Sequence, residues 1–76
     1  MPKYPEIIVR KSEFVEGNST SVVGILIFHL RRYMREQKWS YKKLDVEISN
    51  FVRGTQDLNF EDCVEYARGW VTIVEN

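Results

Sequence analysis

The stretch KWSYKKLDVEISNFVRG, residues 38 to 54, decides how the middle of this chain folds. The hydroxyl of Ser40 can cap the first turn of a helix. Apolar residues then recur at the spacing of one helical face: Tyr41, Leu44, Ile48 and Phe51. Gly54 is typical of a helix end, because glycine adopts the left-handed C-cap conformation without steric cost. The stretch therefore predicts one continuous helix over residues 40–53.

The flanking segments predict two more helices and two strands. Upstream, VEGNSTS has turn chemistry in which Ser19 or Thr20 can cap a helix over residues 20–37. Downstream, Asn59 can cap a third helix whose buried face is formed by Phe60, Cys63, Val64 and Ala67. Residues 5–11 and 70–75 have the composition of strands.

The order strand-helix-helix-helix-strand predicts an α+β fold. Pairing of the N-terminal strand with the C-terminal strand is the simplest closure, so we expect three helices with a two-stranded antiparallel ribbon. Seventy-six residues suffice for one small domain, 1–76, with a limited core.

Residues 48–70, ISNFVRGTQDLNFEDCVEYARGW, resemble the second half of lambda-repressor-like (XRE-type) helix-turn-helix domains. The resemblance is formed by Ile48-Ser49, Arg53-Gly54, Cys63, Ala67 and Trp70. It implies a DNA-binding regulator that reads bases with the helix containing Ile48. The sequence departs from the family where the motif requires a turn, because only three residues separate Leu44 from Ile48.

Composition argues against several functions. One histidine and one cysteine cannot supply a structural zinc site, and neither a catalytic motif nor a phosphate-binding glycine loop is present. We therefore expect no enzyme activity, no cofactor and no metal. The longest apolar run, VVGILIF, is too short to span a membrane. The N-terminus lacks the apolar core of a signal peptide, and a lone cysteine fits a reducing compartment, so we expect a cytoplasmic protein.

Charge is unevenly distributed in a chain whose net charge is zero. Residues 31–43 have six basic residues and one acidic residue, a net +5, whereas residues 44–76 have a net −5. The basic segment can contact phosphates, and the outer face of the next helix offers groups suited to base edges. The candidate nucleic-acid-binding residues are Arg31, Arg35, Lys38, Lys42, Lys43, Asn50, Arg53, Thr55 and Gln56.

Two functions are compatible with the sequence. The first is a small regulator that binds duplex DNA, as a homodimer formed through the apolar helix of residues 20–34. The second is a small inhibitor or adaptor of the phage or mobile-element type, which binds a protein target through aromatic and basic surface residues. The charge asymmetry and the resemblance favour the first.

Overall fold

The computed structural model describes residues 1–75, and its elements confirm the expected order of strands and helices. The strands are β1 (Tyr4–Arg10) and β2 (Val71–Val74), and a short 3-10 helix, η1 (Lys11–Glu13), follows β1. The helices are α1 (Ser19–Glu36), α2 (Tyr41–Gly54) and α3 (Phe60–Arg68). The helix predicted over residues 40–53 is the continuous helix α2, without an internal turn.

Each of the three α-helices begins with a polar side chain that accepts a hydrogen bond from the first turn. Ser40 and Asn59 cap α2 and α3 as predicted, and accept from the backbone N–H three residues further on at 3.2 and 2.8 Å. The cap of α1 is Asn18, which accepts at 3.2 Å, and not Ser19 or Thr20. The amide oxygen of Asn18 satisfies an N–H group that the helix itself leaves unpaired.

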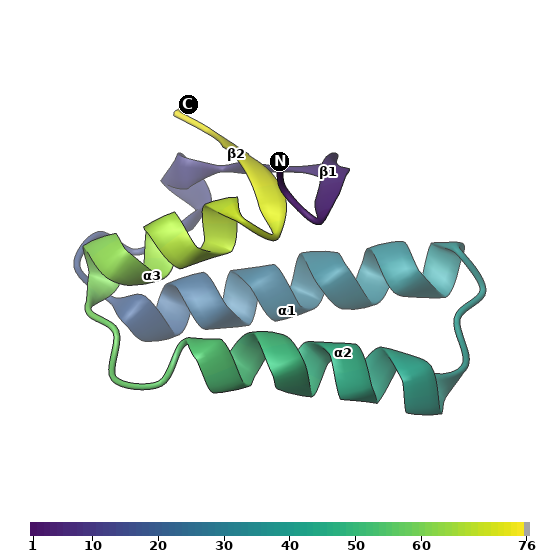
Figure 1. Ribbon diagram of the computed structural model, residues 1–76. Coiled ribbons are helices and arrows are strands. Elements are labelled where there is room, and N and C mark those ends of the chain that lie inside the picture. Colours follow the sequence, from purple (N-terminus) through teal and green to yellow (C-terminus); the bar gives the residue numbers. More distant parts are fainter. Residues whose placement is uncertain (76) are drawn as a thin grey trace.

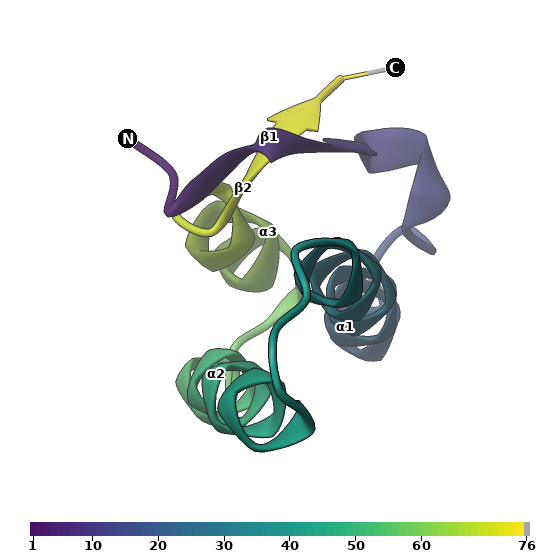
Figure 2. The same ribbon diagram turned by 90° about the vertical axis from the view of Figure 1, so that its right-hand side faces the viewer.

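Helix α1 lies at the centre of the molecule. Seen along the helix axes, the sheet lies on one side of α1 and α3, and α2 lies on the opposite side of α1 (Figure 2). The stripe of α1 that this arrangement buries consists of Val22, Leu26, Leu30 and Met34. Leu44, Ile48 and Phe51 on α2 complete the core on one side of α1, and Ile7 and Val9 on β1 complete it on the opposite side. Three members of the stripe predicted for residues 41–51 are thus buried, whereas the fourth, Tyr41, is exposed.

The two strands pair in parallel, so the predicted antiparallel ribbon is wrong. Ile8, Val9 and Arg10 lie opposite Thr72, Ile73 and Val74 respectively, with an irregularity between Tyr4 and Ile8. The reason is the direction in which α3 returns the chain. The backbone N–H groups of Lys3 and Tyr4 donate to the carbonyls of Gly69 and Trp70 at 2.9 and 2.8 Å, so β2 begins beside the beginning of β1. Strand composition is the same for either direction, and only the path through three helices sets it.

Gly54 is required for a different reason from the one its sequence position indicates. It is not among the residues with positive φ, and it belongs to α2 as its last residue. A Cβ atom at this position would lie 2.1 Å from the hydroxyl oxygen of Tyr66 on α3. That hydroxyl donates to the carbonyl of Phe51 at 3.2 Å, and the Tyr66 ring stacks on the Phe51 ring. Glycine therefore permits the close approach of α3 to the end of α2.

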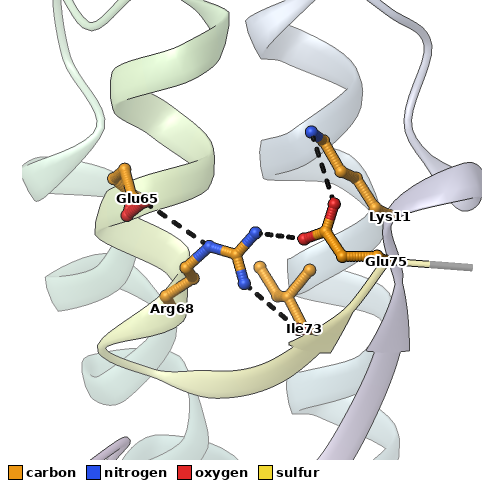
Figure 3. A network of polar contacts seen from close by, with 5 residues as sticks. All are labelled: Lys11, Glu65, Arg68, Ile73 and Glu75. Atoms are coloured by element: carbon orange, nitrogen blue, oxygen red, sulfur yellow. Dashed lines mark hydrogen bonds and ion pairs between the residues drawn. The ribbon is translucent and has the colours of Figure 1, made fainter.

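The short strand β2 is held by charged groups on both sides (Figure 3). The guanidinium of Arg68 donates to the carbonyl of Ile73 at 3.1 Å and to the carboxylate of Glu75 at 2.7 Å. Lys11 lies 3.8 Å from the same carboxylate, and Glu65 lies 3.6 Å from Arg68. Arg68 thus occupies a backbone acceptor of β2 that would otherwise be available to another strand.

The parallel register predicts a specific disulfide. Cysteines introduced as Ile8→Cys and Thr72→Cys lie on paired positions of adjacent strands, about 4.8 Å apart, within the range of about 4.4 to 6.8 Å that a disulfide bridges. We expect rapid oxidative cross-linking of this pair, measured by gel mobility without reductant. The control pair, Arg10→Cys with Thr72→Cys, is two residues out of register and should cross-link slowly. Faster cross-linking of the control pair would contradict this register.

Candidate functional site

Helices α1 and α2 form an antiparallel hairpin (Figures 1 and 2). The connection is short, and Lys38 within it adopts a left-handed conformation with φ 65°. The N–H of Trp39 donates to the carbonyl of Met34 at 3.0 Å, which closes the end of α1 in a Schellman arrangement. A helix-turn-helix motif crosses its two helices at about 90 to 120°, whereas these two lie side by side and run in opposite directions.

The hairpin brings the basic residues of the segment 31–43 to one end of the molecule. We call this group the basic hairpin end: Arg31, Arg35, Lys38, Lys42 and Lys43. All five are exposed. Lys43 covers the ring of Trp39, with its Nζ atom 4.5 Å from the ring centroid. Within residues 1–75, the other four have no carboxylate at ion-pair distance, so their charge faces solvent or a partner.

Aromatic residues lie beside these cations. The side chain of Tyr41, at the start of α2, is 74% exposed, and that of Phe28 on α1 is 59% exposed. A hollow of about 240 Å³ between the two helices is lined by Arg31, Arg35, Tyr41, Leu44 and Asp45. The combination of exposed aromatic rings and arginines is the one that binding hot spots favour.

The remaining candidate residues do not join the basic hairpin end. Asn50, Arg53, Thr55 and Gln56 lie toward or beyond the other end of α2, and ten residues of helix separate Lys42 from Arg53, an axial rise of about 16 Å. Thr55 is only 8% exposed, and its hydroxyl donates to the carbonyl of Val52 at 2.7 Å. Its expected role at a base edge is therefore incompatible with its burial.

Asn50 also has a structural partner, because its side chain hydrogen-bonds the carboxylate of Glu47. Glu47 accepts from the hydroxyl of Tyr4 as well, and it forms an ion pair of 2.8 Å with Lys3. The Lys3 ammonium also lies 4.5 Å from the centroid of the Trp70 ring. The sequence does not reveal this cluster, because Tyr4 and Glu47 are 43 residues apart in the chain.

The cluster shifts the pKa of both acidic partners. Partial burial raises the pKa of Glu47, but hydrogen bonds from Lys3, Tyr4 and Asn50 outweigh that effect, and the net shift is downward. Burial and the neighbouring carboxylate of Glu47 raise the pKa of the Tyr4 phenol. A more acidic carboxylate beside a less acidic phenol is suited to holding β1 against α2, and poorly suited to proton transfer near neutral pH.

The histidine and the cysteine lie apart from the basic hairpin end. His29 Nε2 lies 2.9 Å from the carboxylate of Glu13, and this contact lowers the pKa of Glu13. Cys63 is buried, and burial raises the pKa of its thiol. In the part of the chain that the structure describes, no three histidine, cysteine or acidic residues are arranged to hold a metal ion.

The apolar surface of α1, on which the expectation of a homodimer rests, is mostly inside the fold. Residues 22, 26, 30 and 34 are fully buried, and the neighbouring Val23, Ile25 and Ile27 are partly buried against the core. Phe28 is the large apolar residue of α1 that stays exposed. No helix within residues 1–75 has both the length and the apolarity needed to cross a membrane.

Comparisons with known proteins found no matching family model, no matching curated protein and no matching solved structure.

Replacing Glu47 tests whether its cluster stabilises the fold. We expect Glu47→Gln to lower the free energy of unfolding by about 1 to 3 kcal/mol near pH 7, because Lys3 loses its charged partner in a half-buried site. Glu36→Gln, which removes only the exposed pair with Arg32, should cost less than about 0.5 kcal/mol. Urea unfolding of the three proteins gives both values.

The effect of Glu47 should depend on pH in one direction. Its folded pKa is lowered, so its contribution is present above the unfolded value of about 4.3 and is lost as the pH falls through the folded pKa. The difference between the wild type and Glu47→Gln should therefore shrink in acid. A difference that grows below about pH 4 would contradict this assignment.

Proposed function

We propose that this chain is a small non-enzymatic binding protein, of the inhibitor or adaptor type, whose basic hairpin end engages an acidic surface of a protein partner in the cytoplasm. The observation that supports this best is the set of four exposed cations, Arg31, Arg35, Lys38 and Lys42, which have no acidic partner within residues 1–75. Unpaired charge on one face steers and orients an oppositely charged partner.

Several acidic residues of the chain, unlike these four cations, have partners within the fold. Glu13, Glu47 and Glu75 each contact a basic side chain, at 2.9, 2.8 and 2.7 Å. Glu61 and Asp62 lie in the first turn of α3, where the helix dipole favours negative charge. Much of the acidic charge thus supports the fold, whereas the four cations of the basic hairpin end form no ion pairs within residues 1–75.

Duplex DNA is the second candidate partner, and the same four cations favour it. They can contact phosphates independently of sequence. Reading of base edges has less support, because Thr55 is buried, Asn50 bonds Glu47, and only Arg53 and Gln56 of that group stay exposed and unpaired in the described residues. In addition, α1 and α2 lie side by side, so neither projects from the hairpin as a recognition helix that could enter a DNA groove.

One pair of charge reversals separates the two candidates. Arg35→Glu and Arg53→Glu change the net charge equally, and each replaces the basic residue in the last turn of its helix, so their structural costs are matched. If a protein is the partner, Arg35→Glu should abolish capture of one stoichiometric partner from the native host, and Arg53→Glu should leave that capture intact. Affinity capture with quantitative mass spectrometry measures this.

The DNA candidate makes a different prediction for the same variants. Fluorescence anisotropy with a random duplex at about 50 mM salt would then show binding that weakens steeply with added salt. Both substitutions would weaken it if α2 lies along a groove. Strong duplex binding by the wild type, with equal loss in both variants, would overturn the proposed protein-binding function.

A further inference from the structure

Gly24 and Phe28 are poor choices for an exposed helix face, and packing within the folded chain explains neither of them beyond an edge contact between the rings of Phe28 and His29. Gly24 is in the interior of α1, is exposed, and is not among the residues with positive φ. A Cβ atom added to it would meet nothing within 4 Å. Alanine would therefore fit and would favour the helix. Phe28, one turn further on, is 59% exposed.

A hollow lies on this face of α1. Its volume is about 640 Å³, with Gly24, Ile27 and Phe28 at the apolar end and Arg31, Arg32 and Arg35 at the other. Glu36 also lines it and pairs with Arg32 at 3.5 Å. Arg31 and Arg35 are left without an acidic partner in residues 1–75, and they also line the hollow beside Tyr41.

The spacing arranges these features in one line. Gly24, Phe28, Arg31 and Arg35 are at positions i, i+4, i+7 and i+11 of a helix, so they form a single stripe about 16 Å long. Absence of a side chain at Gly24 lets another element approach the α1 backbone closely. The stripe therefore offers an apolar seat at one end and two unpaired guanidinium groups at the other.

We propose that this stripe binds an amphipathic acidic helix of the protein partner. One apolar side chain of that helix lies over Gly24 and against the Phe28 ring. Carboxylates one and two turns further along that helix pair with Arg31 and Arg35. Surfaces that bind a helix commonly recognise side chains at this helical spacing. The inference rests on the proposed function and adds the chemistry of the partner segment and the residues that select it.

Charge complementarity selects this occupant over two others. A second copy of the chain that docked through the same stripe would present its own row of arginines to this one, and like charges brought together oppose association. A nucleic acid would satisfy the arginines, but the apolar seat at Gly24 offers nothing to a phosphate backbone. An acidic amphipathic helix satisfies both ends of the stripe.

Selection of a random peptide library displayed on phage tests the inference with the full chain as bait. We expect enriched peptides to share an apolar anchor followed by Asp or Glu one and two turns later. Their affinity should fall about tenfold or more for Gly24→Leu, which fills the seat, and for Phe28→Ala. Ser49→Leu, the same added side chain on the exposed face of α2, is the matched control and should bind like the wild type.

Thermal melting checks that the variants fold. Gly24→Leu should melt at or above the wild-type temperature, because leucine is a better helix former than glycine, so loss of peptide binding by this variant cannot be due to unfolding.

Each other outcome overturns the inference. Acidic peptides that lose binding to Arg35→Glu, but bind Gly24→Leu and Phe28→Ala normally, would leave the proposed function standing and remove the Gly24 seat. Enriched peptides without acidic residues would remove the charge pairing. Failure to enrich any peptide, together with a random duplex whose binding is lost in Phe28→Ala, would assign the stripe to nucleic acid.

Discussion

Burial of the central helix α1 is the constraint on which the rest of this structure depends. Its stripe of Val22, Leu26, Leu30 and Met34 is fully buried because the sheet, α3 and α2 surround it (Figure 2). A chain of this size can form only one such core. Helices α2 and α3 and strand β1 are therefore placed by how they cover α1, and part of the surface of α1 and α2 remains uncovered.

The exposed surface of α1 and α2 differs from the surface around the sheet in how its charges are paired. Around the sheet, charges are paired in ways that support the fold: Arg68 holds β2 (Figure 3), and Glu47 holds the start of β1 through Lys3 and Tyr4. At the basic hairpin end the cations are left without acidic partners in residues 1–75. Surface ion pairs contribute little stability, so leaving these cations unpaired costs the fold little while keeping their charge available to a partner.

A small basic surface on a chain of zero net charge has consequences for binding. Long-range attraction to any polyanion is weak because the acidic and basic halves cancel at a distance. Selectivity must then come from short-range fit, which is where exposed Phe28, Tyr41 and the hollow beside them matter. These surface features favour a shaped protein partner over a uniform phosphate backbone.

Local features were predictable because their causes are local. Ser40 and Asn59 cap helices with groups a few residues away, and the apolar spacing within residues 41–51 fixes which face of α2 is buried, so the helices and the α+β class follow from sequence alone. The uneven charge of residues 31–43 is likewise a property of the sequence, although the hairpin is what gathers it at one end.

Other features depend on contacts between distant segments. The parallel direction of β2 follows from the route of α3 back to Lys3 and Tyr4, and Gly54 is explained only by Tyr66 on another helix. The sequence predicts that Thr55 and Asn50 are available to a ligand, but Thr55 is buried and the side chain of Asn50 bonds Glu47. The sequence by itself determined the elements and their charges, because those depend on near neighbours. Strand direction, and which polar groups remain free, were decided only by tertiary packing, because they depend on residues that meet after the chain has folded.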